Sequence, residues 1–297
     1  MLQFYRQTGL QRFVRTTGLL GIMGEDWVRA EAMTPEAPLQ TGVQIGHTYR
    51  AEGHPTGTVA FFAGCVMNSL LGDVNRATID LLNAAGYDVV VPDGQICCGA
   101  LANHAGMRKV ATQMAGANLT AFHAGGKGWD DLEAIIVNAS GCGAMLAEYP
   151  LLIEGADSFS SKITDISAFL ATTPVQSRFE RRLDLRVGYD DPCHLLHAQG
   201  VRNPPRDLLQ AIPGVEFVEV PGADECCGSA GVYNLTQPEL AGQILDRKME
   251  RVKAANLDVL VTGNPGCLFQ LQYGARRHGL DIEVVHIAEF VRRAVES

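Results

Sequence analysis

The sequence lacks the long apolar run that a transmembrane helix needs. It has 297 residues, 46% of them hydrophobic, but no stretch approaches the roughly 18 uninterrupted apolar residues of a membrane span. Positive charge is also scarce, since the formal net charge is −9, which argues against a general affinity for nucleic acid or anionic membranes. We therefore expect a cytoplasmic protein, either free or peripheral at a membrane, with no transmembrane segment and no nucleic-acid partner.

Two further absences limit the cofactors and the cross-links that we expect in this chain. No G-x-G-x-x-G turn follows a predicted strand, so we expect no flavin or nicotinamide to be bound by this chain. No signal peptide is recognisable, and a chain of this size can build its core without disulfides. Adjacent cysteines could bond each other only through a strained eight-membered ring. A structural disulfide framework is therefore not expected.

The N-terminal 57 residues have a pattern of their own. Residues 1–24 contain Arg6, Arg12 and Arg15, no acidic residue, and apolar residues at helical spacing. This pattern favours an amphipathic helix that docks on a partner or on the chain itself, and binding to a membrane surface is the alternative. Residues 33–57 are rich in Pro and Gly and are expected to form an extended strap. We expect 1–57 to be a docking arm and strap.

The chain contains eight cysteines, and their order along the sequence forms a repeat. Each half of the chain contains a cysteine, then a CCG triplet, then a last cysteine, at nearly equal spacings and with none left over. The first set precedes residue 173 and the second follows residue 183. The eight residues are Cys65, Cys97, Cys98, Cys142, Cys193, Cys226, Cys227 and Cys267.

The segments that flank the cysteines repeat as well. "TVAFFAGC" resembles "LRVGYDDPC", and "AIIVNASGCGAML" resembles "DVLVTGNPGCLFQL". Apolar strands that alternate with helices are typical of parallel sheets covered on both faces. We expect an α/β fold of two tandem modules, 58–173 and 183–297, related by a pseudo-two-fold axis and linked near 172–182. Each module has a mostly parallel sheet flanked by helices.

The repeat predicts where the cysteines meet. Ligand sites of parallel sheets lie beyond the carboxyl ends of the strands, and each cysteine loop follows a strand, so the four sulfurs of a module are expected at one rim. Four thiolates suit zinc or an iron–sulfur cluster. Neighbouring side chains of a CC pair diverge, which fits one small ion poorly and a wider cluster better. Nearby glycines leave N–H groups free to donate to sulfur. Zinc, or no metal, stays open as the alternative.

The same residues resemble a known family. "CCGALANHAG", "NASGCGAML", "DPCHLLHAQG", "CCGSAGVYNL" and "GNPGC" are similar to the CCG cysteine-rich domains of the C-terminal half of the glycolate oxidase iron–sulfur subunit and of lactate-utilisation iron–sulfur proteins. The likeness to the CCG-domain subunit of heterodisulfide reductase is more distant. The resemblance implies that the eight cysteines bind 4Fe-4S clusters in one or both modules.

Two departures from the family pattern bear on function. Glycolate-oxidase-type members carry a ferredoxin-like domain ahead of the CCG pair, and no such motif is present here. The heterodisulfide reductase pattern has a fifth cysteine in each half, which is also absent. The resemblance implies a non-flavin subunit that passes electrons in a complex oxidising glycolate or lactate, with a flavin subunit or a ferredoxin-like protein as partner. The alternatives are cluster-based reduction of a disulfide or other sulfur substrate, and a non-catalytic scaffold that holds zinc or no metal.

A few residues near the cysteines are further candidates. His194 and His197 follow Cys193, and His104 follows the first CCG. These side chains, with Tyr233 in the second half, are possible polar neighbours of the bound group. Asp190 and Asp191 are expected to build the turn before Pro192. Arg202 and Arg206 could bind a carboxylate substrate or lie in a solvated loop.

Overall fold

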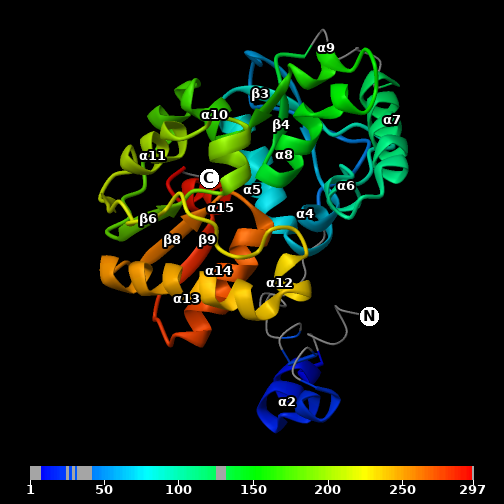
Figure 1. Cartoon of the computed structure of the whole chain (residues 1–297). Coiled ribbons are helices and arrows are strands. Elements are labelled where there is room, and N and C mark those ends of the chain that lie inside the picture. Colours follow the sequence, from blue (N-terminus) through cyan, green and yellow to red (C-terminus); the bar gives the residue numbers. More distant parts are fainter. Residues whose placement is uncertain (1–7, 25–26, 29–30, 32–41, 125–131, 296–297) are drawn as a thin grey trace.

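The computed structural model describes residues 8–24, 27–28, 31, 42–124 and 132–295. Two mostly parallel sheets, each flanked by helices, form two modules that lie side by side (Figure 1). The α/β class and the two-sheet architecture expected from the sequence repeat are confirmed.

The first module contains a five-stranded sheet in the order β1-β3-β2-β4-β5. All its strand pairs are parallel except β1 with β3. Its elements are β1 (Thr48–Tyr49), β2 (Gly57–Phe62), α4 (Cys65–Leu70), α5 (Gly72–Ala84), β3 (Tyr87–Val90), α6 (Ala100–His104), α7 (Arg108–Ala124), β4 (Ile135–Val137), α8 (Ser140–Ala147), η3 (Tyr149–Leu151), α9 (Asp157–Ser160), β5 (Ile163–Asp165) and α10 (Ile166–Ala171). A short helix, η4 (Pro174–Arg178), leads to the second module.

The second module repeats this order around a four-stranded parallel sheet, β7-β6-β8-β9. Its elements are β6 (Arg186–Asp190), η5 (His194–Ala198), α11 (Asn203–Gln210), β7 (Glu216–Phe217), α12 (Tyr233–Thr236), α13 (Pro238–Ala255), β8 (Val259–Thr262), α14 (Pro265–Arg277), β9 (Glu283–His286) and α15 (Ile287–Arg292). Each cysteine follows the carboxyl end of a strand in both modules, because the crossover helices return the chain to the opposite edge. The sequence repeat predicted the site at this edge of each sheet.

The two modules share one apolar core. Buried residues from the central strands of both sheets, such as Phe61 and Tyr189, belong to the same cluster as Phe290 of α15. Helix α5 packs on α15, and α10 packs on α11, so the helices between the sheets belong to both modules. The outer face of each sheet has a separate core, under α7 and α8 in the first module and under α13 and α14 in the second. The modules are therefore joined by burial of apolar surface, the main stabilising term in folding.

Part of the expected strap lies against the first sheet. Tyr49 in β1 pairs antiparallel with Val89 of β3, and the main-chain N–H of Ala51 donates to the Asp88 carboxylate. Helix α2 (Leu10–Thr17) and the short helix η1 (Leu19–Met23) lie apart from both sheets, at the lower end of the molecule in Figure 1. Residues 33–41 of the expected strap fall outside the described residues, as do residues 1–7, 25–26 and 29–30 of the arm.

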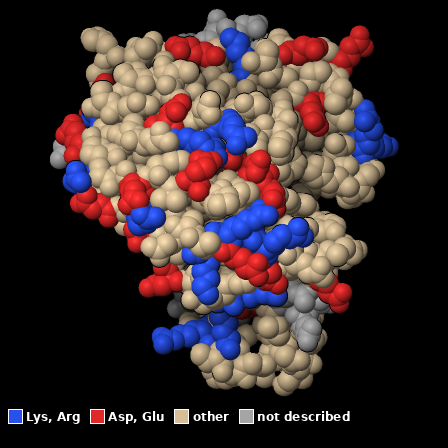
Figure 2. Space-filling view, turned by 60° about the vertical axis from the view of Figure 1, so that its left-hand side comes forward, with Lys and Arg blue, Asp and Glu red and all other residues tan. Residues whose placement is uncertain are grey.

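Surface charges are largely mixed in sign. Arg293 pairs with Glu283, and Arg182 with Asp184. Basic and acidic side chains lie next to one another on the face shown in Figure 2. No helix among the described residues is both long enough and apolar enough to span a membrane.

Candidate metal centre

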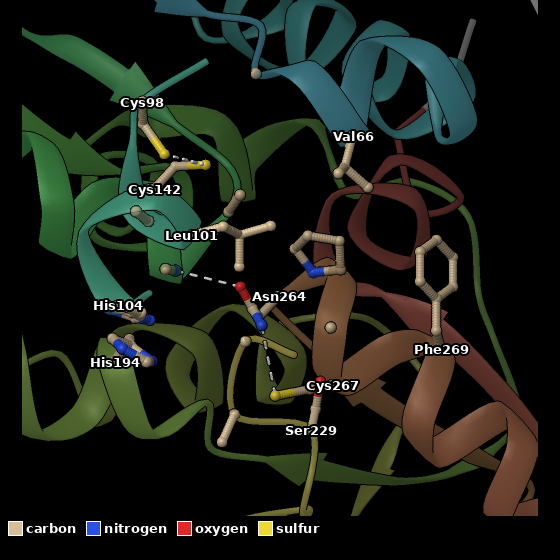
Figure 3. Close-up of a pocket in the computed structure, with 18 of the residues that line it drawn as sticks. Val66, Cys98, Leu101, His104, Cys142, His194, Ser229, Asn264, Cys267 and Phe269 are labelled. Carbon is tan, nitrogen blue, oxygen red and sulfur yellow. Dashed lines mark hydrogen bonds between the residues drawn. The ribbon is translucent and has the colours of Figure 1, made fainter. Parts of the chain in front are cut away.

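The four cysteines of the first module come together at the edge of its sheet. Cys65 begins α4, Cys97 and Cys98 lie in the loop after β3, and Cys142 lies in the first turn of α8. The Cys98 and Cys142 Sγ atoms are 3.3 Å apart (Figure 3). The Cys97 thiol contacts those of Cys65 and Cys98. We call these four residues the first quartet.

The second module builds the same arrangement. Cys193 lies just before η5, Cys226 and Cys227 follow β7, and Cys267 lies in the first turn of α14. Cys226 contacts Cys193 and Cys227, and Cys227 contacts Cys267. These four residues form the second quartet. In the part of the chain that the structure describes, no set of three or more His, Cys, Asp or Glu side chains has the geometry of a single bound metal ion; the thiols contact one another in successive pairs.

One cysteine in each quartet is favoured as a thiolate. Hydrogen bonds from the thiols of Cys65 and then Cys98 lower the pKa of Cys97 to about 2. Hydrogen bonds from Cys193 and then Cys227 lower the pKa of Cys226 to about 2 in the same way. Each quartet therefore concentrates negative charge on the first cysteine of its CC pair, and thiolate is the form in which cysteine binds metal.

The glycine of each CCG triplet explains how its loop is held. The main-chain N–H of Gly99 donates to Cys97 Sγ at 3.5 Å, and that of Gly228 donates to Cys226 Sγ at 3.3 Å. Both glycines have a left-handed backbone, with φ of 88° and 89°. A Cβ at Gly228 would meet the Ala241 carbonyl oxygen at 2.6 Å, and one at Gly99 would meet Ala111 Cα at 3.3 Å. Only glycine allows this turn and this close approach of the following helix.

The two quartets face each other across one cavity of about 530 Å³, which all eight cysteines line. Leu70, Leu101, Leu235 and Phe269 contribute to its apolar walls. Asn264 joins the two sides: its Oδ1 accepts from the Gly141 N–H at 3.2 Å, and its Nδ2 donates to Cys267 Sγ at 3.6 Å (Figure 3). The sequence repeat predicted one rim per module, but it did not predict that the rims would face each other.

Two of the four polar candidates lie at this cavity. The rings of His104 and His194 stack with centroids 5.9 Å apart, and both residues line the cavity. His194 Nδ1 is 3.6 Å from Cys193 Sγ, and burial followed by the neighbouring His104 lowers the pKa of His194. His197 is exposed on η5, and neither it nor Tyr233 lines the cavity.

The sequence did not reveal the residues that support each CCG loop from below. In the first module, Asn118 of α7 accepts a hydrogen bond from the Ile96 N–H at 2.8 Å and donates to the Cys97 carbonyl at 3.1 Å and the Tyr149 hydroxyl at 3.0 Å. The Tyr149 hydroxyl in turn donates to the Cys98 carbonyl at 3.0 Å. Asn118 is fully buried. In the sequence, nothing distinguishes this asparagine from a polar helix residue that faces solvent.

In the second module, a buried ion pair supports the loop. Lys248 of α13 donates to the Asp190 carboxylate and, at 2.9 Å, to the Ala223 carbonyl. Asp191 forms a two-hydrogen-bond ion pair with Arg206, at 2.8 and 2.7 Å. The expectation that Asp190 and Asp191 only build a turn is therefore wrong, because both side chains are buried in ion pairs. Arg206 is also wrong as a substrate ligand, since its guanidinium is occupied by Asp191 and Glu219.

The comparisons with known proteins agree with this geometry. The cysteine-rich domain (CCG) profile matches residues 59–147 and again 187–272. The chain belongs to the CCG cysteine-rich domain family. The "Probable glycolate oxidase iron-sulfur subunit" of Bacillus subtilis is 38% identical over 310 aligned residues, which cover 99% of this chain and 68% of that protein.

Other relatives in this family differ in their described roles. One subunit of the fumarate reductase (CoM/CoB) of Methanothermobacter marburgensis is 34% identical over 81% of this chain, which spans 47% of that protein. "Lactate utilization protein A" of Oceanobacillus iheyensis is 31% identical over 78% of this chain and 96% of its own length. A glutamate racemase structure from Bacillus anthracis superimposes with a TM-score of 0.33 at 12% identity, over 80% of each chain, which is too distant to inform function.

The donor set of each quartet fits an iron–sulfur cluster. Thiolate is the usual ligand of such clusters, and four cysteines are the usual number. Two adjacent cysteines, such as Cys97 and Cys98, can each reach a different iron of a cluster. The Gly99 and Gly228 N–H groups already point at sulfur. Hydrogen bonds to sulfur are one of the means by which a protein sets a cluster's potential.

Proposed function

We propose that the chain is an iron–sulfur redox subunit that passes electrons in a complex oxidising a 2-hydroxy acid such as glycolate or lactate. The observation that carries this proposal is the pair of cysteine quartets on one cavity. The names of the relatives from Bacillus subtilis and Oceanobacillus iheyensis support the choice of reaction.

In this proposal each quartet holds one cluster, of the 4Fe-4S type. Such a cluster, when bound, supplies one-electron transfer. The chain's own residues position it: Cys97 and Cys226 supply thiolate, the CCG glycine N–H groups donate to sulfur, and the apolar walls limit access of water. His104 and His194 are polar side chains that line the same cavity beside the quartets.

The proposal assigns substrate oxidation to a partner. We assign it to a flavin-containing subunit, and we place a ferredoxin-like iron–sulfur protein between that subunit and this chain or after it. The complex is placed in the cytoplasm, where it can also lie at the membrane periphery. The chain then needs no acid–base chemistry on the hydroxy acid itself.

We further propose that the N-terminal segment is the docking element for that partner and that 58–173 and 183–297 are the two working modules. In support, Phe13, Ile22 and Trp27 are 56%, 85% and 57% exposed. Leaving such apolar surface in water costs about 25 cal/mol per Å². Deletion of residues 1–30 is expected to weaken association with the partner and to leave the iron content unchanged. Loss of iron with unchanged association would contradict this assignment.

Anaerobic purification tests the main proposal. We expect a brown protein with broad absorbance near 400 nm and with iron and acid-labile sulfide in equal amounts. The isolated chain should not reduce a dye with glycolate or lactate, but it should do so once the flavin subunit is added. Stoichiometric zinc without sulfide would support the scaffold alternative and contradict the proposal. Dye reduction by the flavin-free chain would contradict the assignment to a partner.

A second candidate function is reduction of a disulfide or related sulfur substrate. The shared cavity favours it, because both quartets could act on one bound molecule. This chemistry needs an open iron, which a four-cysteine site offers only if one cysteine is not a ligand. Disulfide-dependent reoxidation of the reduced protein would favour this second function over the first.

A further inference from the structure

The two modules bring their quartets to the shared cavity in the same way. The CCG glycines pack on Ala111 of α7 and Ala241 of α13. Asn118 and Lys248, two helical turns further along these helices, occupy equivalent positions, and each supports a CCG loop from below. Two sites of the same build therefore face one cavity of about 530 Å³.

The wall of this cavity has almost no charge apart from that of the cysteines. Among the described residues that line it there is no Lys, Arg, Asp or Glu. Figure 3 shows Val66, Leu101 and Phe269 on the wall that Cys98 and Cys267 share. A bound anion would have no cationic partner here, which is costly in an apolar site, and thiolates would repel it. The cavity therefore suits a neutral ligand and not a 2-hydroxy acid, which is an anion at pH 7.

Apolar side chains from both modules lie on the solvent side of the sulfurs. Leu101 and Leu235 line the cavity and are 47% and 56% exposed. Cys98 and Cys227, the second cysteine of each CC pair, are each only 3% exposed. The loop before α12 meets α6 at this outer side, since a Cβ at Gly231 would lie 3.5 Å from Leu101 Cδ2. Clusters held by the cysteines belong to the inner side, which leaves the apolar outer side for a second molecule.

Two imidazole rings provide hydrogen-bonding groups beside these leucines. His104, from the first module, is exposed and stacks on His194, from the second module, with ring centroids 5.9 Å apart. Both residues line the cavity. A ring N–H can donate a hydrogen bond to an oxygen of a bound molecule. The ligand that fits this wall is therefore apolar and uncharged, with a hydrogen-bonding oxygen at its edge.

We propose that the cavity binds the electron acceptor of the complex, an uncharged quinone, which takes electrons from both quartets. This inference rests on the proposed function. Two one-electron centres on one cavity match an acceptor of two electrons. The hydroxy acid loses two electrons and two protons at the partner subunit. The quinone gains two electrons from this chain and two protons from solvent, so that each of its two carbonyl groups becomes a hydroxyl.

Equilibrium dialysis of duroquinone, a small neutral quinone, against the oxidised, iron-loaded full-length chain measures binding directly. We expect saturable binding. Leu101→Glu and Leu235→Glu each place a charge on the apolar wall and should weaken binding at least about tenfold. Leu240→Glu is the matched control, because Leu240 is 50% exposed in the second module but does not line the cavity. It should change the affinity by less than about twofold. Equal affinity in all three variants would overturn the proposal.

Reoxidation of the reduced chain by duroquinone tests whether the bound quinone is the one that reacts. The rate should saturate with quinone concentration and should fall in Leu101→Glu in parallel with binding. An unchanged rate in that variant would mean that the quinone reacts elsewhere on the surface and would overturn the proposal. If the glutamate variants do not fold, His104→Phe decides the question. It keeps an aromatic ring but removes the ring N–H, so the affinity should fall about two- to tenfold, and unchanged affinity would overturn the proposal.

The outcomes distinguish this inference from the proposed function. Iron and sulfide in the chain without saturable quinone binding overturns the inference alone. Binding and reoxidation with a neutral disulfide, bis(2-hydroxyethyl) disulfide, but without binding of duroquinone, also overturns the inference and favours the second candidate function. A chain without iron and sulfide overturns the proposed function, and the inference with it.

Discussion

Asn118 and Lys248 occupy the same place in the two modules, yet they hold their loops by different means. Asn118 forms neutral hydrogen bonds to the main chain of Ile96 and Cys97. Lys248 forms a buried ion pair with Asp190 and a bond to the Ala223 carbonyl. A neutral amide costs little to bury once it is hydrogen-bonded, whereas a buried charge costs several kcal/mol unless it is paired. The two modules therefore share a backbone arrangement and differ in the electrostatics beneath it.

The largest expected effect is a loss of bound iron and sulfide, and measuring it tests whether the two modules are independent. Cys97→Ala with Cys98→Ala should remove about half of the bound iron and sulfide, because each quartet uses only cysteines from its own module. The reciprocal pair, Cys226→Ala with Cys227→Ala, serves as the control and should remove the other half. Metal analysis of both variants measures this. Loss of all iron from either variant would show that the quartets load as one unit across the shared cavity.

The next largest expected effect is on the free energy of unfolding, and it compares the two supporting residues, Lys248 and Asn118. Lys248→Met leaves the Asp190 carboxylate buried without its ion pair and should lower the free energy of unfolding by about 3–5 kcal/mol. Asn118→Ala leaves main-chain groups of the first loop unpaired and should cost about 1–3 kcal/mol. Urea unfolding of the cluster-free chain at pH 7 measures both. Adding Asp190→Asn to Lys248→Met should recover part of the loss; equal costs for the two single variants would contradict the comparison.

A third effect compares the residues that begin the last helix of each module. Asp165 caps α10 and His286 caps α15 at equivalent positions. Burial raises the pKa of Asp165 from 3.8 to about 6 and lowers the pKa of His286 from 6.5 to about 4. Between pH 6 and 4 the folded state therefore gains stability from protonation of Asp165. Over the same range it loses stability because His286 is protonated first in the unfolded state.

These two contributions oppose each other, and each is on the order of 2–3 kcal/mol across that range. Asp165→Asn should make the protein lose more stability than the wild type on acidification from pH 6 to 4. His286→Asn should make it lose less. Urea unfolding at several pH values measures the differences from the wild type. If the free energy of unfolding of both variants changes with pH by the same amount as that of the wild type, neither group titrates as its burial indicates.

The smallest effect concerns Asn264, whose counterpart in the first module is Ala139. Asn264→Ala removes the acceptor of the Gly141 N–H and the donor to Cys267 Sγ. The expected loss is about 0.5–1.5 kcal/mol in the free energy of unfolding, since each is a single, partly buried hydrogen bond. The shared apolar core should hold the modules together without it. A loss above about 3 kcal/mol would show that this bridge, and not the core, joins them.

Much of the site could be predicted because its chemistry is repeated in the sequence. The C, CCG, C order and the strand before each cysteine were enough to group the eight thiols correctly, since loops at the carboxyl ends of parallel strands meet at one edge. The roles of Asp191 and Arg206 were not predictable. They pair across fifteen positions only because α11 packs beside β6, and an aspartate before proline otherwise indicates a turn.

The amino-acid sequence by itself determined the two modules, the strand and helix order of each, and the membership of each quartet. All of these follow from local periodicity and from repeated spacing. Only the tertiary structure decided that the quartets face one cavity, that the modules share a core, and that Asn118 and Lys248 are counterparts. Those features depend on which buried surfaces of distant segments fit together. An apolar residue has no local sequence pattern that shows which distant segment it will pack against.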